Sequence, residues 1–115
     1  MMKHIVMFRK LAHVDRQPAL EQQLVAKMHA LDAEIPFIRE WRVSGNELQR
    51  PICWDYVLES SFDSREDLER YLPHPAHSAL IQALKAYFEW VACDYTVQDA
   101  AATTERVRAR LQKIT

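Results

Sequence analysis

Two prolines, Pro73 and Pro75, constrain this sequence more than any other feature because they stand only two positions apart. Each proline removes a backbone N–H donor and disfavours α-helical geometry in the residue before it. A single helix through residues 65–90 is therefore disfavoured, although apolar residues recur with a helical period on both sides. The sequence predicts two helical segments joined at this break.

The break, residues 71–77, carries three polar rings, those of Tyr71, His74 and His77. His77 falls in or near the first turn of the second helical segment. Free N–H groups and the positive end of the helix dipole favour an anion and a neutral imidazole there. This arrangement suits acid–base or oxyanion-binding chemistry. A structural alternative is a proline-capped kink in which the histidines pack or cap the helix, and the local pattern leaves both interpretations open.

Alternating apolar and polar residues predict four β-strands, and apolar residues spaced by three or four predict helices between them. In chain order these are a strand at residues 3–9, a helix at 15–34, strands at 37–44 and 53–62, the two helical segments, and a strand at 90–97. The strand at 37–44 has one charged face, which is typical of a sheet edge. The order β-α-β-β-α-β is that of the ferredoxin-like α+β fold, an antiparallel four-stranded sheet with both helices on one face.

The ends of the helices can also be predicted. Asp15 is the expected N-cap of the first helix, and Pro18 lies in its first turn. Ser64 is the expected N-cap of the next helical segment, with Asp67 completing an approximate capping box. After the prolines, a helical stripe continues through Leu80, Leu84, Phe88 and Val91.

Both faces of the first predicted strand are apolar, with His4, Val6 and Phe8 on one face and Ile5 and Met7 on the other. Because the helices cover only one face of the sheet, a second copy of the chain is the simplest cover for the other face. The sequence therefore predicts a homodimer that forms through the open sheet face, with His4 pointing into a covered layer.

One domain is expected at residues 1–97, followed by a tail at residues 98–115. Val107, Leu111 and Ile114 make a weak helical stripe among basic residues in the tail. We expect a terminal helix that docks or frays, and the alternative is an arm that binds a membrane or a partner.

Composition argues against several function classes. The net charge of -1 shows no basic surplus, so we expect no nucleic-acid partner. Gly45 is the only glycine, which rules out the glycine-rich phosphate loops of nucleotide-binding folds. Cys53 and Cys93 lack metal-ligand spacing and are expected as reduced core thiols. No apolar run approaches the length of a membrane span or a signal-peptide core, so we expect no membrane partner and a cytoplasmic location.

Seven short segments form a recognisable set: residues 2–9 (MKHIVMFR), 44–46 (SGN), 54–58 (WDYVL), 62–64 (FDS), 67–71 (DLERY), 74–77 (HPAH) and 94–95 (DY). Together they resemble the stress-responsive dimeric α/β-barrel (Dabb) family. The opening strand and the HPAH segment are a specific pair, and the resemblance runs from residue 2 to about residue 97. It implies a homodimer whose two sheets form a barrel.

A plant polyketide cyclase resembling this family closes an aromatic ring, and residues matching His4, Tyr71 and His77 line its cavity. Chemically this set is coherent: His77 could act as the general base that removes a proton next to a carbonyl, and Tyr71 could donate a hydrogen bond to the developing enolate oxygen. His4 would orient these groups or relay a proton. Such an aldol-type cyclisation requires no metal, nucleotide or other cofactor. The residues expected to bind the ligand are Phe8, Met28, Leu31, Leu72, His74, Leu84 and Phe88.

Two classes of function remain. The first is a homodimeric binding or stress-protection module with a small apolar cavity for an apolar or aromatic ligand. The second is a cofactor-independent cyclase or lyase acting on a small aromatic or polyketide-like carbonyl compound. Related barrels also include haem-degrading and cofactor-free monooxygenases, which keeps an oxidative alternative open. His74 and His77 suggest a metal pair, but a third ligand is missing unless His4 converges on them.

Overall fold

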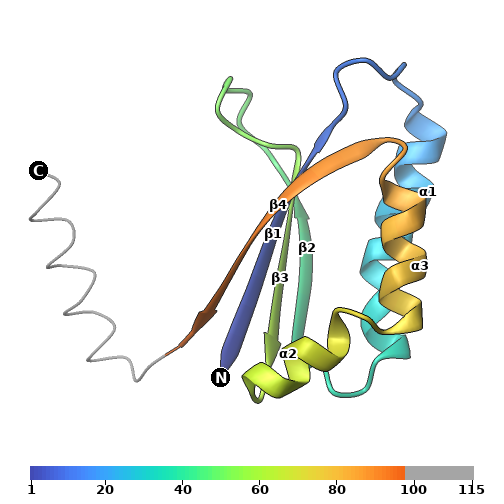
Figure 1. The fold of residues 1–115 in the computed structure, drawn as a ribbon. Helices are drawn as coiled ribbons and strands as arrows, with labels where there is room; N and C mark the ends of the chain where they lie inside the picture. Colours follow the sequence, from blue (N-terminus) through green and yellow to red (C-terminus); the bar gives the residue numbers. More distant parts are fainter. Residues whose placement is uncertain (98–115) are drawn as a thin grey trace, which may run out of the picture.

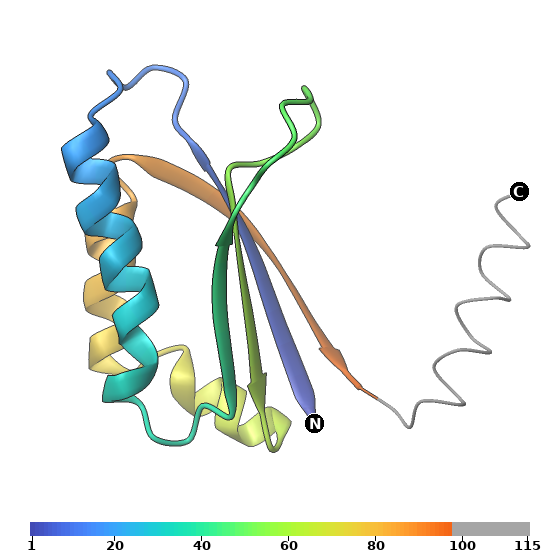
Figure 2. The ribbon, with the colours of Figure 1, turned by 180° about the vertical axis from the view of Figure 1, so that it is seen from behind.

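The computed structural model describes residues 1–97 and has the predicted ferredoxin-like order. Its elements are β1 (Met2–Lys10), α1 (Pro18–Ala30), the 3-10 helix η1 (Leu31–Glu34), β2 (Glu40–Gly45), β3 (Tyr56–Phe62), α2 (Arg65–Tyr71), α3 (Pro75–Leu84) and β4 (Phe88–Thr96). The strands form one antiparallel sheet in the order β2-β3-β1-β4, so the predicted edge position of β2 is confirmed. Helices α1 and α3 lie side by side on one face, and the other face is open (Figures 1 and 2).

Strand β1 lies at the centre of the sheet and sets the register of its neighbours. His4 stands opposite Ser60 on β3 and opposite Asp94 on β4. Because side chains alternate along a strand, these three residues share the face that the helices cover. His4 is 5% exposed, which confirms that it points into a covered layer.

The prolines separate α2 from α3, as predicted. Ser64 caps α2, and its hydroxyl accepts a hydrogen bond from the Asp67 backbone N–H at 3.2 Å. The prediction of Asp15 as the N-cap of α1 is wrong. Pro18 is the first helical residue, and Gln17, which precedes it, makes no side-chain cap. The Gln17 backbone N–H donates to the Tyr87 hydroxyl.

The predicted helical stripe through Phe88 and Val91 is also wrong, because α3 ends at Leu84. Tyr87 N–H bonds to the Leu84 carbonyl in a turn, and Phe88 then pairs with Lys10 as the first residue of β4. Leu84 and Phe88 are four residues apart and both lie in the core, but Leu84 belongs to α3 and Phe88 to β4.

Two strands are shorter than predicted. Strand β2 begins at Glu40, because a turn precedes it in which the Ile38 N–H bonds to the Ile35 carbonyl. Strand β3 begins at Tyr56, after a turn in which the Cys53 N–H bonds to the Arg50 carbonyl. Both cysteines are free, as predicted, but neither lies in the core: Cys53 is half-buried and Cys93 is exposed.

The core fills the layer between the sheet and the helices. Its most deeply buried large apolar residues come from α1, α2, α3, β3, β4 and two loop positions: Met28, Ile35, Phe62, Tyr71, Leu84, Tyr87 and Phe88. The tail predicted at residues 98–115 lies outside the described residues. Among the helices of residues 1–97, none has the length and apolarity needed to cross a membrane.

Candidate functional site

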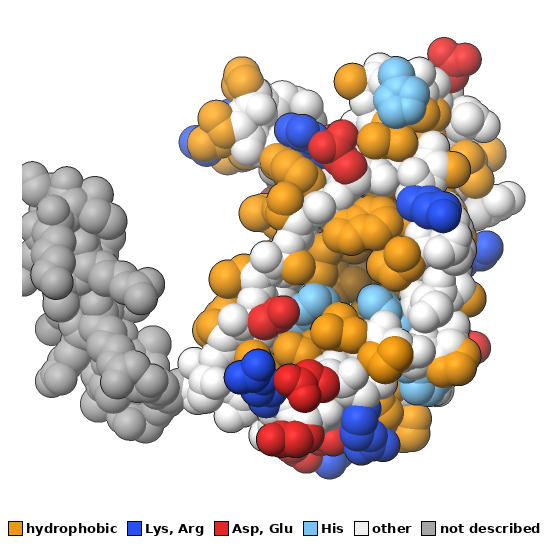
Figure 3. All heavy atoms as spheres, in the orientation of Figure 1, with side chains coloured by type: hydrophobic (Ala, Val, Ile, Leu, Met, Phe, Trp, Pro, Cys, Tyr) orange, Lys and Arg blue, Asp and Glu red, His pale blue; other side chains and the backbone are white. Residues whose placement is uncertain are grey.

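A cavity of about 160 Å³ lies between the sheet and α3. Figure 3 shows a hollow with an apolar lining in this region, flanked by two histidine side chains. The apolar walls come from β1, β3, β4 and α3, and the polar groups come from β1, α2 and α3. The lining residues are His4, Val6, Phe8, Leu58, Tyr71, Leu72, His77, Leu80, Ile81, Leu84, Trp90 and Ala92.

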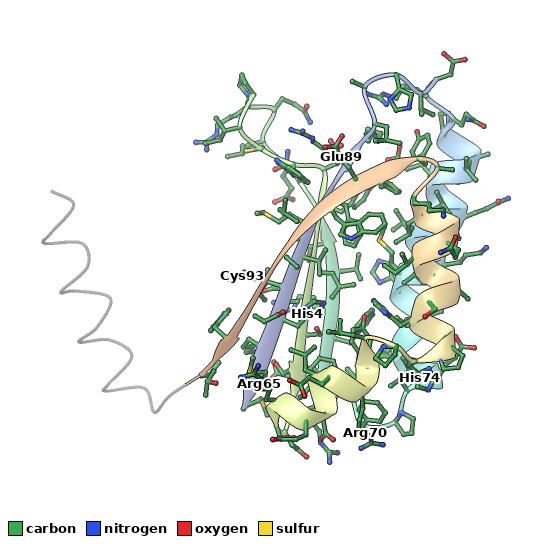
Figure 4. All side chains as sticks on the ribbon, viewed as in Figure 1. His4, Arg65, Arg70, His74, Glu89 and Cys93 are labelled. Carbon is green, nitrogen blue, oxygen red and sulfur yellow. The ribbon has the colours of Figure 1, made fainter. Side chains whose placement is uncertain are left out.

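The structure brings the three residues predicted as catalytic, His4, Tyr71 and His77, to this one cavity. Of the residues predicted to bind a ligand, Phe8, Leu72 and Leu84 also line it. Met28, Leu31 and Phe88 are buried in the core and do not line it, and His74 lies at the start of α3 (Figure 4). The sequence reasoning missed Val6, Leu58, Leu80, Ile81, Trp90 and Ala92.

His77 is held as one defined tautomer. Its Nδ1 lies 2.8 Å from the Leu72 carbonyl oxygen. Because a carbonyl only accepts hydrogen bonds, neutral His77 carries its proton on Nδ1 and leaves a lone pair on Nε2. Burial lowers the pKa of His77 below its ordinary value of 6.5, assisted by His4 and His74, and the bond to Leu72 only partly opposes this shift. His77 is therefore neutral near pH 7, as a proton acceptor must be.

Tyr71 lies beside both histidines. Its ring centroid is 4.4 Å from that of His77 and 5.8 Å from that of His4. The residue is 2% exposed, and burial raises the pKa of its hydroxyl, which therefore stays protonated at neutral pH. Within residues 1–97 the Tyr71 hydroxyl has no hydrogen-bond partner, so it is free to donate to a molecule in the cavity.

His4 is positioned by the strands on both sides of β1. Its Nδ1 donates to the Asp94 carboxylate on β4, and the Ser60 hydroxyl on β3 donates to the His4 carbonyl at 3.0 Å. The carboxylate keeps the proton on Nδ1, so Nε2 is the other polar atom that His4 offers. Asp94 was not predicted as a site residue. The cross-strand pairing of His4 with Asp94 is the signal that identifies it.

His74 has a structural contact. Its Nδ1 accepts a hydrogen bond from the Ala76 backbone N–H at 3.1 Å and so caps α3. Its ring also lies 6.4 Å from that of Phe37. The two histidines of the HPAH segment therefore differ: His74 caps the helix and His77 lines the cavity.

The cavity brings a neutral imidazole, a protonated phenol and a carboxylate-bound imidazole against an apolar wall. Within residues 1–97, no group of three His, Cys, Asp or Glu side chains is arranged to hold a metal ion. The donors present suit the binding of a small molecule that has an apolar body and one polar end, and the transfer of a proton to or from it.

Comparison with known proteins places the chain in a family. The family model described as the stress responsive A/B barrel domain matches residues 2–97. An uncharacterized protein of Streptomyces coelicolor is 34% identical over 95 residues, which are 83% of this chain and 98% of that protein.

Two solved structures show the same fold. A dimeric ferredoxin-like protein of unknown function from Bacteroides fragilis is 29% identical with a TM-score of 0.72, over 84% of this chain and 95% of that chain. The hydroxynitrile lyase of Passiflora edulis is 18% identical with a TM-score of 0.73, over 86% of this chain and 94% of that chain. The family model and the Streptomyces relative together show that the chain belongs to the stress responsive A/B barrel domain family.

Proposed function

We propose that this protein is a homodimeric module that binds a small, largely apolar molecule in the cavity between the sheet and α3. The observation that carries the proposal is the cavity itself, whose apolar lining is interrupted only by His4, Tyr71 and His77. Ligand sites are typically apolar clefts with a few polar groups that fix orientation. The family resemblance is consistent with a protective role in stress, but the cavity supports binding more directly.

The size and lining of the cavity limit the ligand. A dry cavity of about 150 Å³ holds a benzene-sized molecule, and this cavity has about 160 Å³. Phe8 and Trp90, whose ring centroids lie 5.8 Å apart, offer aromatic surface to a flat ligand. A single aromatic ring with one carbonyl or hydroxyl group matches both the volume and the polar end.

The homodimer is proposed from the open sheet face. Met7 and Val91 are paired across β1 and β4 and are 44% and 46% exposed, and Tyr95 on the same face is also 46% exposed. Contiguous apolar surface of this kind marks an interaction site. The similar protein from Bacteroides fragilis is described as dimeric with a ferredoxin-like fold, which supports a second copy as the partner.

A thermal-shift screen tests the binding proposal. Wild type, Tyr71→Phe and His77→Asn are heated with small aromatic ketones, phenolic acids and haem, and light scattering measures the mass in parallel. We expect a small aromatic compound to raise the melting temperature of wild type and to lose this effect in both variants. If no compound binds, or if a compound raises the melting temperature of both variants as much as that of wild type, the proposed site is wrong.

A second candidate is a cofactor-independent cyclase or lyase, which the His77 tautomer specifically favours. In this reaction Nε2 of His77 takes a proton from the carbon next to a carbonyl. The C–H electron pair forms the C=C bond of the enolate and the carbonyl π pair moves onto the oxygen, to which the Tyr71 hydroxyl donates a hydrogen bond. The enolate carbon then bonds to a second carbonyl carbon, and His77 returns its proton to the new alkoxide. The hydroxynitrile lyase of Passiflora edulis supports this class only by its fold, at 18% identity.

Turnover by wild type separates the two candidates once a ligand is found, and His77→Asn, assayed at saturating compound, then tests whether His77 is the base. If His77 is only a binding or structural group, the variant folds and no turnover is lost, because wild type has none. If His77 is the base, the folded variant loses a turnover that wild type shows. Single-turnover assays with the bound compound, followed by mass spectrometry of products, measure this difference.

We further propose that the protein acts in the cytoplasm without nucleic-acid or membrane partners. Free thiols at Cys53 and Cys93 fit a reducing compartment. The net charge of -1 supplies no positive surplus for phosphate groups. Cell fractionation and a nucleic-acid retardation assay test these points, and recovery in a membrane fraction would contradict them.

A further inference from the structure

The loop between β2 and β3, residues 46–55, projects from the sheet on the side away from the helices (Figures 1 and 2). We call this loop the arm. It presents the two most exposed large apolar side chains of residues 1–97, Leu48 at 67% and Ile52 at 75%. Isolated apolar residues on a surface need no explanation, but two in one short loop beside an apolar sheet face form a patch.

Hydrogen bonds hold the arm in one shape. The Asn46 side chain donates to the Leu48 carbonyl at 2.8 Å, and the Cys53 N–H bonds to the Arg50 carbonyl at 3.0 Å. At its base the Asp55 N–H bonds to the Phe8 carbonyl at 2.7 Å, and the Asp55 carboxylate accepts from the Lys10 N–H at 2.8 Å. The exposed apolar side chains therefore sit on an ordered loop, which lowers the entropy lost when a partner binds.

The arm and the open face form one surface. A hollow of about 590 Å³ lies between them, lined by Met7 and Val57 of the sheet and by Leu48 and Ile52 of the arm. Met7 and Val57 are direct cross-strand partners on the face that the helices leave open. A binding partner that fills this hollow therefore contacts both the sheet and the arm.

The apolar part of the open face is small compared with the interface of a stable dimer. Its β2 side is charged, with ion pairs Lys3–Glu40 at 3.1 Å and Arg42–Glu59 at 3.9 Å. The apolar part follows β1 and β4, two strands of nine residues each. Such a pair has a footprint of roughly 10 Å by 30 Å, or about 300 Å². A stable interface buries about 800 Å² of accessible surface on each partner, polar and apolar together, so surface beyond these two strands must take part.

We infer that the arm is a dimerisation element that reaches onto a second copy of this chain, where Leu48 and Ile52 are buried. The inference rests on the homodimer of the proposed function and names the segment that completes its interface. In a twofold dimer the contact is made twice, once by each arm.

Sedimentation velocity over a dilution series tests the inference with full-length protein. The arm variant is Leu48→Ser/Ile52→Ser, the face variant is Val91→Asp, and the matched control is Glu47→Gln/Gln49→Ser, which changes only polar residues of the same loop. Circular dichroism and thermal melts check that each variant folds. We expect the arm variant to raise the dimer dissociation constant at least tenfold and the control to leave it within twofold.

The outcomes separate the two proposals. If wild type and the arm variant dimerise equally while the face variant is monomeric, the homodimer stands and the role of the arm is overturned. If wild type is monomeric at every concentration, the homodimer falls and the inference falls with it. An equal loss in the arm variant and the polar control would also overturn the inference, because loop shape rather than apolar contact would then be responsible.

Discussion

Two buried tyrosines of this fold allow a direct test of whether the cavity is kept for a ligand. Tyr71 and Tyr87 are 2% and 1% exposed, so their rings bury similar apolar area. Their hydroxyls differ. Within residues 1–97 that of Tyr71 has no hydrogen-bond partner, whereas that of Tyr87 donates to Glu21 Oε1 at 3.0 Å and accepts from the Gln17 N–H at 3.2 Å. Changing each tyrosine to phenylalanine removes only the hydroxyl.

The two substitutions should affect the free energy of unfolding differently. Tyr87→Phe removes one hydrogen bond to a charged group and one to a backbone N–H, which should lower the free energy of unfolding by about 2–3 kcal/mol. Tyr71→Phe removes a hydroxyl that gains nothing from a protein partner. Its free energy of unfolding should stay the same or rise by up to about 1 kcal/mol, because no protein hydrogen bond is lost and a phenyl ring costs less to desolvate than a phenol. At about 4 °C for each kcal/mol, the two melting temperatures should separate by roughly 8–16 °C.

The assay is urea unfolding followed by circular dichroism at one fixed protein concentration, since the stability of a dimer depends on concentration. The same variants are then tested for ligand-induced thermal shift. We expect Tyr71→Phe to be the stable variant that loses ligand binding, the pattern of a residue retained for function at some expense in stability. A loss of more than about 1 kcal/mol in Tyr71→Phe would refute the reasoning, because its hydroxyl would then have a stabilising partner in the folded protein.

Three further predictions follow from the contacts of single side chains. Because burial lowers the pKa of His77 below 6.5, any turnover that uses His77 as a base should fall as pH drops through that lowered pKa and level off above it in a pH–rate profile; an inflection above pH 7 would contradict this. Burial opposes the shift of Glu21, but hydrogen bonds from Tyr56 and Tyr87 and the charge of Lys10 outweigh it and lower its pKa below 4.5. The stability that this carboxylate contributes is present above pH 4.5 and lost as pH falls through the lowered pKa, so Glu21→Gln should cost about 1.5–3 kcal/mol at pH 7 and flatten this part of the stability–pH curve. Ser64→Ala should cost about 1 kcal/mol in urea unfolding by removing the cap of α2, and Ser64→Asp should restore most of it; equal losses in both would show that the cap contributes little.

Much of the fold could be predicted because its signals are local. The paired prolines separate α2 from α3, and Ser64 begins α2, since both effects act on neighbouring backbone groups. The failures have a local cause as well. Asp15 is an N-cap by residue type, but it lies two residues before Gln17, which directly precedes the helix, and the Gln17 backbone N–H is bonded to Tyr87 from the other end of the core.

The candidate site could be predicted only in part. The HPAH segment drew attention to both His74 and His77, but spacing alone did not distinguish the helix cap from the cavity residue. Asp94 lies 90 positions from His4 in the chain. Its contact exists because β4 pairs antiparallel with β1 in one particular register. The walls formed by Trp90 and Ala92 depend on the same register.

The sequence by itself determined the order of the elements, the break at Pro73 and Pro75, the apolar face of β1 and the residues that could exchange protons. These properties follow from backbone geometry and side-chain period within a few residues. Only the tertiary structure decided that His4, Tyr71 and His77 meet at one cavity, that Tyr71 lacks a partner within residues 1–97, and that the arm lies beside the open face. Strand register and the packing of α3 on the sheet bring together residues far apart in the chain, and a local pattern does not encode either one.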